Sequence, residues 1–163
     1  MRYSLFIPLF ACFATSVSCG PMYKNPPKDP AKTATLRSNE TRSGLYTWAN
    51  HTVEAIDNLP VNYAASWTSE TKEIVVTSGV HELVMGGTFN RGFLAGGPYS
   101  ARGDLRMNFK PGRNYKANGR VEGSKLAMWI EDTETSQPVS ETIRIPYQFI
   151  PQTTYTPIFI PAN

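Results

Sequence analysis

The stretch DLRMNFKPGRNYKANGRVEGSKLAMWIED, residues 104–132, decides the expected fold. Apolar side chains take every second position at its start, as in Leu105, Met107 and Phe109. A period of two is typical of a β-strand with one buried face. The sequence Lys110-Pro111-Gly112-Arg113 indicates a turn, because proline presets one φ and glycine supplies a positive one. The stretch therefore predicts three short strands joined by turns, with apolar sets at Leu105/Met107/Phe109, Tyr115/Ala117/Val121 and Leu126/Met128/Ile130.

The same period of two continues on both sides of this stretch. It predicts a strand that ends at Ile56, with Val53 and Ala55 on one face and Ile56 on the other. It also predicts a strand over 72–77 that pairs with a strand over 81–85 after a turn at Ser78-Gly79. A last strand is expected over 143–149. The segment 47–56 comes nearest to a helical apolar stripe, but its β-branched residues favour a strand. About seven or eight short strands predict an all-β fold, a single antiparallel, immunoglobulin-like β-sandwich in preference to a small barrel.

Composition limits the classes of protein that this chain can belong to. With 163 residues and 40% hydrophobic residues, it can bury the core of one domain and is too apolar to be wholly disordered. Its net charge is +3, and its 16 basic residues are scattered along the chain. Nucleic-acid binding proteins usually show a clustered basic stripe, so a nucleic-acid partner is not expected.

Residues 1–18 have the features of a signal peptide, and we leave them out of the fold. Arg2 gives a positive start, and residues 3–14 are almost wholly apolar. This apolar run is too short to span a bilayer as a helix. Small residues follow at 14–18, before Cys19-Gly20.

An apolar stretch that ends in small residues and a cysteine resembles the lipobox of bacterial lipoproteins. The resemblance implies that Cys19 becomes the first residue of the mature chain and carries fatty-acyl chains such as palmitate. Gly20, in place of Asp, then implies attachment to the outer membrane, facing the periplasm. Two alternatives stay open: a box that ends at Cys12, and a secreted protein cut at Ser18 in which Cys19 is a free or intermolecularly paired thiol.

The residues after Cys19 are expected to form a tether over 19–34. Four prolines in the fourteen residues GPMYKNPPKDPAKT, 20–33, block both helix and central strand because proline lacks a donor. An extended, semi-rigid spacer that holds the domain clear of the lipid head groups is predicted. The sandwich domain then covers 35–150, and a Pro-rich tail covers 151–163.

The middle of the chain, residues 53–139, also resembles the β-sandwich domains of bacterial lipoproteins. The resemblance rests on short elements in the same order: Ile56-Asp57, Gly79-Val80-His81, Phe109 with Pro111-Gly112 and Tyr115, and Trp129-Ile130-Glu131-Asp132. Many of these domains have no assigned activity. The resemblance therefore implies fold and location and transfers no catalytic residue.

Few side chains in the sequence suit catalysis or metal binding. His51 and His81 are the two histidines, without a second ligand at metal-site spacing, and a cross-strand hydrogen bond or a capping role is expected for His81. Glu131 and Asp132 are neighbours, so a strand would point them to opposite faces. Residues 132–136 are expected to form a hairpin turn in which Asp132 accepts hydrogen bonds from backbone amides. No enzyme activity, metal or cofactor is expected, and a hydrolase that uses Glu131 or His81 is kept as a third hypothesis.

The segment GGTFNRGFLAGGPYSARG, residues 86–103, holds half of the chain's glycines and is expected to be an unusually long loop. Aromatic and arginine side chains on such a loop are the types enriched in interfaces. The candidate binding residues are Phe93 and Tyr99 for stacking, with Arg91 or Arg102 to hold a carboxylate. The competing interpretation is a mobile hairpin extension without a partner.

The last segment, residues 146–163, carries too many apolar residues for a solvated tail. It either packs back on the sheet as an edge strand or adds a strand to another chain.

Together these features predict a non-enzymatic, membrane-anchored periplasmic lipoprotein that acts through protein–protein contacts with an envelope partner. The alternative is a module that binds glycan, such as cell-wall material, or another small ligand through segment 86–103.

Overall fold

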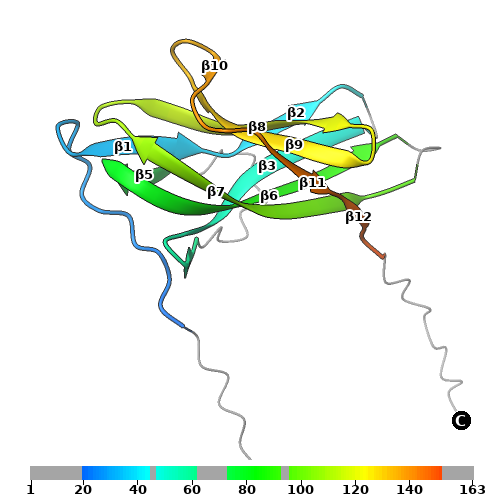
Figure 1. Ribbon diagram of the computed structural model, residues 1–163, viewed down its shortest axis with the longest axis horizontal. Helices are drawn as coiled ribbons and strands as arrows, with labels where there is room; N and C mark the ends of the chain where they lie inside the picture. The colour runs from blue at the N-terminus through cyan, green and yellow to red at the C-terminus, as the bar shows by residue number, and fades with distance from the viewer. Residues whose placement is uncertain (1–19, 45–46, 62–72, 93–95, 152–163) are drawn as a thin grey trace, which may run out of the picture.

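The computed structural model describes residues 20–44, 47–61, 73–92 and 96–151. These residues form two mostly antiparallel sheets of six strands each, packed face to face, and they contain no helix (Figure 1). The predicted all-β sandwich is thereby confirmed. Cys19 and Phe93, two of the candidate residues, lie outside the described residues.

The first sheet, called the A sheet, has the strand order β10 (Gln137–Pro138), β9 (Lys125–Asp132), β8 (Asn114–Glu122), β1 (Thr33–Arg37) and β5 (Glu73–Thr77), and β11 (Ile143–Pro146) also pairs with β9. The second, the B sheet, has the order β12 (Gln148–Phe149), β7 (Tyr99–Phe109), β6 (Gly79–Arg91), β3 (Thr47–Ile56) and β2 (Asn39–Arg42), and β4 (Leu59–Pro60) pairs with β3. The pair of β1 and β8 is parallel.

At two points, the chain passes from one sheet to the other within a single residue. Ser38 separates β1 of the A sheet from β2 of the B sheet, and Tyr147 separates β11 from β12. The predicted strand 143–149 is therefore two short strands in different sheets. Its second half pairs with β7 as an edge strand that ends at Phe149, and the Ile150 N–H donates to Pro98 O at 2.8 Å. The rest of the predicted tail, residues 152–163, lies outside the described residues.

The core lies between the two sheets and is built from alternate residues of the long strands. The three strands expected from residues 104–132 are present as the end of β7, β8 and β9. Their inward side chains, together with those of β6, are almost fully buried: Leu83, Met85, Phe89, Leu105, Met107, Phe109, Leu126, Met128 and Ile130.

Three further sequence-based expectations are wrong, and the first concerns residues 86–103. This segment is not a long loop, because β6 runs to Arg91, β7 begins at Tyr99, and Phe89 pairs with Tyr99 across the hairpin. Two of its glycines, Gly87 and Gly103, mark places where the other sheet approaches closely. A Cβ on Gly87 would collide with the Leu126 side chain, and one on Gly103 would lie 2.6 Å from Ile145 Cδ1.

The second correction concerns Ile56, which we expected on the face opposite to Val53. A β-bulge between Val53 and Ala55 inserts Glu54 as an extra residue, so the alternation changes face. Ile56 therefore points into the core and is 0% exposed.

The third correction concerns the strands on either side of Ser78-Gly79. They do not pair with each other, because β5 pairs with β1 in the A sheet while β6 pairs with β3 and β7 in the B sheet. Gly79, with φ of 125°, carries the chain across from one sheet to the other.

Candidate functional site

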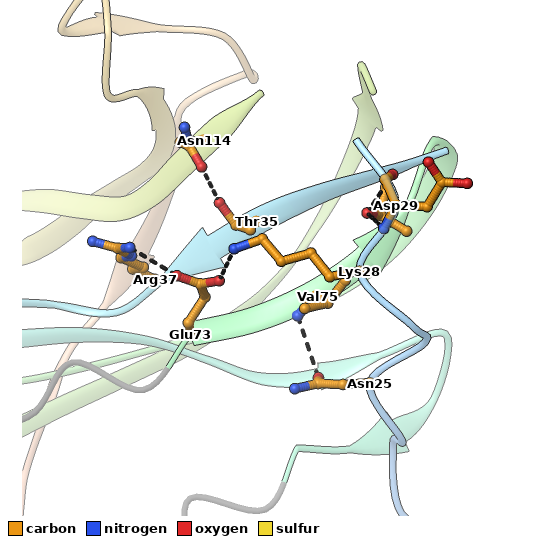
Figure 2. A network of polar contacts seen from close by, with 9 residues as sticks. Asn25, Lys28, Asp29, Thr35, Arg37, Glu73, Val75 and Asn114 are labelled. Carbon is orange, nitrogen blue, oxygen red and sulfur yellow. Dashed lines mark hydrogen bonds and ion pairs between the residues drawn. The ribbon is translucent and has the colours of Figure 1, made fainter. Parts of the chain in front are cut away.

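The segment that follows Cys19 lies against the free edge of β5 rather than clear of the domain (Figure 2). The Tyr23 hydroxyl donates to Val75 O at 2.8 Å, and the Tyr23 N–H donates to Pro60 O at 2.9 Å. The Val75 N–H in turn donates to Asn25 Oδ1 at 3.3 Å. These two side chains occupy backbone groups that an edge strand would otherwise present to another chain.

The rest of this segment is joined to the domain by charges and a turn. Glu73 receives Lys28 Nζ on one oxygen and Arg37 Nη2 on the other, each at 2.7 Å (Figure 2). Hydrogen bonds from Lys28 and Arg37 hold the pKa of Glu73 below its usual value. Asp29 O accepts from the backbone N–H and the hydroxyl of Thr33, which places the chain at the start of β1.

The predicted spacer thus contains neither helix nor strand over residues 20–29, but from Tyr23 onward it is bound to the sandwich. The sequence gives the proline content that keeps this segment out of helix and strand. It does not show that a tyrosine and an asparagine reach the open edge of a strand about fifty residues later.

Two of the candidate binding residues, Arg91 and Tyr99, belong to an aromatic cluster at one end of the sandwich. Phe89 stacks on Tyr99 at 5.5 Å between ring centroids and meets Tyr147 edge-on at 5.0 Å. Arg91 lies over the Tyr147 ring at 5.1 Å and donates to the Tyr147 hydroxyl and to Gly123 O. Through these contacts, Arg91 holds the end of β6 against the A sheet.

Arg102, the third described candidate, lies on the opposite face of β7 from Tyr99, because it is three positions, an odd number, further along the strand. It is largely exposed, and its Nε lies 3.0 Å from Glu54 Oε2. A Cβ on Gly86 would clash with the Glu54 side chain, so this glycine leaves room for that side chain to lie across β6. The structure therefore brings Arg91 and Tyr99 together and keeps Arg102 apart, which contradicts a single groove that uses Tyr99 and Arg102.

His81 has a structural role of the kind expected. Its Nδ1 lies 2.6 Å from Asp57 Oδ2, and its Nε2 lies 3.0 Å from Thr77 O. The ring thereby ties the β3–β4 turn to the end of β5. Burial raises the pKa of Asp57, but the hydrogen bonds from His81 and the Glu82 N–H together outweigh this effect. The pKa of Asp57 is therefore below its usual value.

The acidic candidates are also held by neighbours. Glu131 receives Lys116 Nζ at 2.9 Å and Asn118 Nδ2 at 2.7 Å, and these contacts outweigh burial and lower its pKa. Asp132 Oδ1 accepts from the Glu134 and Thr135 N–H groups, which confirms the predicted hairpin turn. Within the described ranges, no group of three or more His, Cys, Asp or Glu side chains is placed to hold a metal ion.

A feature that sequence reasoning missed is an open hollow of about 670 Å³ over β2 and β3. Its lining residues are Glu40, Arg42, Gly44, Trp48 and Asn50. The signal was present as two short polar stretches on either side of Gly44, but their register is needed to see that they face one another.

Comparison of the chain with protein-family models, with curated proteins and with solved structures gives no match in any of the three. In the described part of the chain, no helix has the length and apolar character needed to cross a membrane.

Proposed function

We propose that this chain is a non-enzymatic lipoprotein, anchored by acylated Cys19 to the outer membrane and facing the periplasm, where it acts through contacts with another envelope protein. The observation that carries the proposal is that the segment after Cys19 is bound to the edge of the sandwich. The lipobox-like sequence ends at Cys19, and four residues later Tyr23 is bound to β4 and β5.

The binding of Tyr23 to the sandwich would limit the distance between the lipid and the domain. An extended chain covers at most about 3.6 Å per residue, so four residues allow a lipidated residue 19 a reach of at most about 14 Å from Tyr23. Acyl chains on Cys19 would then hold the end of the sandwich that carries β4 and β5 close to the head groups. Each buried methylene contributes about 0.8 kcal/mol to such an anchor, and two or more chains make it stable.

The non-enzymatic part of the proposal is supported by what the candidate catalytic groups do. His81 is bound to Asp57 and Thr77, Glu131 to Lys116 and Asn118, and Asp132 closes a turn. Groups engaged in this way stabilise the sandwich, so we assign them positions in the scaffold rather than in a reaction.

Replacing Cys19 with Ser is expected to abolish incorporation of a tagged palmitate and to release the protein from the membrane fraction. The matched control is Cys12→Ser, which removes the other cysteine and should leave label and location unchanged. The measurement is the label on the purified protein, together with its distribution between membrane and soluble fractions.

The same cells provide a test of protein contact. An amine-reactive crosslinker should join the wild type to a distinct envelope protein, and the adduct should be lost in Cys19→Ser because the released domain no longer lies beside that partner.

Palmitate label that persists in Cys19→Ser, or a wild type that takes up no label, would contradict the anchor. A wild type that crosslinks to no other protein would contradict the contact.

A further inference from the structure

We infer that the hollow over β2 and β3 is a binding site for a pyranose sugar of an oligosaccharide, with the indole of Trp48 as its stacking surface. The described lining of the hollow includes no residue of segment 86–103, and the site does not depend on the lipid anchor. Four side chains of the described residues line it, two from each strand of the hairpin on either side of Gly44.

The register of the hairpin places these four side chains on one face. Glu40 pairs with Asn50 and Arg42 pairs with Trp48. Since alternate residues of a strand share a face, all four project from the outer side of the B sheet, away from the core. His51, their neighbour on β3, points the other way and is 2% exposed. Residues on a paired sheet hold such a site more rigidly than a loop would.

The lining combines an apolar surface with hydrogen-bonding groups, and a sugar, which has an apolar C–H face and hydroxyl groups, needs both. Trp48 offers a flat apolar ring, whereas Asn50 offers both a donor and an acceptor. Within the described chain, neither side chain makes a hydrogen bond to another residue in the structure, so their polar groups are available to a ligand. The volume of about 670 Å³ falls in the range of about 300–1,000 Å³ that is usual for ligand sites.

The charges of the hollow argue against an anionic ligand such as a phosphate. Arg42 Nε lies 2.6 Å from Glu40 Oε1, so the two charges of the lining compensate each other. Glu40 retains a second oxygen that can accept from a sugar hydroxyl, and Arg42 retains N–H groups that can donate to one. A ring with an apolar C–H face and hydroxyls around its rim satisfies the indole, the carboxamide and the ion pair together.

The polar surface continues beyond the hollow, which favours an oligosaccharide over a single ring. On β6, Asn90 pairs with Trp48 and Thr88 pairs with Asn50, so both lie on the same outer face. Farther across the sheet, Glu54 and Arg102 form a second compensated pair. A sugar chain that leaves the hollow would pass over uncharged or neutralised side chains.

The hollow and the contacts of Tyr23 also lie at opposite ends of β3. Trp48 is near one end of this strand, and Ile56, beside β4, is at the other. Eight residues of a strand span about 26 Å. A domain held near a bilayer through Tyr23 would therefore keep this hollow accessible to a polysaccharide.

The test is titration calorimetry of the full chain in detergent with two probes, a β-1,4-linked N-acetylglucosamine tetramer and a β-1,4-linked glucose tetramer. We expect the wild type to bind at least one of them. Trp48→Ala should weaken binding by about tenfold or more, because it removes the stacking surface. Trp129→Ala is the matched control, since Trp129 lies on β9 of the other sheet, and it should bind like the wild type.

Asn50→Ala keeps the test valid if Trp48→Ala fails to fold, because this surface change should also weaken binding. A preference for the acetamido tetramer that disappears in Asn50→Ala would identify the acetamido group as the partner of the carboxamide. Equal binding of both tetramers would identify the shared pyranose ring as the recognised feature. The inference is overturned if the wild type binds neither tetramer, or if folded Trp48→Ala or Asn50→Ala binds as well as the wild type.

Discussion

Replacing Phe89 with Ala is expected to lower the free energy of unfolding by about 3–5 kcal/mol. Phe89 is 2% exposed, and it joins the two sheets where β6 approaches the switch from β11 to β12. It stacks on Tyr99, meets Tyr147 edge-on and lies beneath Arg91 at 5.9 Å. Truncation removes all of these contacts and leaves a cavity that the surrounding strands cannot fill.

Phe149→Ala is the matched control for this substitution. Phe149 is the same residue type in the same neighbourhood, and its ring contacts Tyr99 at 5.9 Å, but it is 55% exposed. Its truncation should cost less than about 1 kcal/mol. Urea unfolding followed by circular dichroism measures both variants. Equal losses for Phe89→Ala and Phe149→Ala would show that the cluster does not stabilise the sandwich as described.

Acidification should destabilise the protein through His51 by about 3 kcal/mol in total, over the interval from about pH 6.5 down to about pH 4. Burial lowers the pKa of His51 from 6.5 to about 4, and its Nδ1 has no hydrogen-bond partner among the residues that the structure describes. Each pH unit between these values corresponds to about 1.4 kcal/mol. The ring packs against Gly119 of β8, where a Cβ would lie 2.6 Å from its Cδ2, so it has little room to move.

The sign follows from proton uptake. The unfolded chain binds a proton on His51 near pH 6.5, whereas the folded chain resists it until about pH 4. Between these values the unfolded state holds more protons, so the free energy of unfolding falls as the pH falls. This contribution is complete above pH 6.5 and is lost progressively below it.

His51→Leu removes the titrating ring, and its free energy of unfolding should change less with pH in this interval than that of the wild type. His81→Gln keeps His51 and should retain the part of the decline that His51 causes. Denaturant unfolding at a series of pH values gives the curves. The same slope in His51→Leu and the wild type would contradict a buried, neutral His51.

The strands of residues 104–132 could be predicted because their information is local. Leu105, Met107 and Phe109 alternate with polar residues, and the turn at Pro111-Gly112 has the chemistry that a tight turn requires. Each of these features is contained in a few neighbouring residues. The structure reproduces them as β7, the turn and β8.

The glycines of residues 86–103 misled the prediction because glycine has two uses in a chain. It permits turns, but it also leaves space where another layer lies close to the backbone. Gly87 and Gly103 serve the second use, beneath Leu126 and Ile145 of the A sheet. Sequence alone does not show which residues face them, so the glycine content predicts a loop where the structure has strands.

Sheet membership could not be predicted because it is decided by contacts between distant residues. The turn at Ser78-Gly79 suggested a hairpin, yet β5 pairs with β1, about forty residues earlier. The same holds for the candidate hollow. Glu40 and Arg42 meet Asn50 and Trp48 only through the register of β2 and β3. The candidates that were named for their residue type, Arg91 and Tyr99, proved to be part of the aromatic cluster instead.

Mass spectrometry of the N-terminal peptide, from protein purified out of its native membrane, tests the proposed anchor most directly. We expect a mature chain whose first residue is Cys19 and whose mass includes covalent acyl groups. An N-terminal peptide that still contains residues 1–18, or one that begins at an unmodified Cys19, would contradict the account.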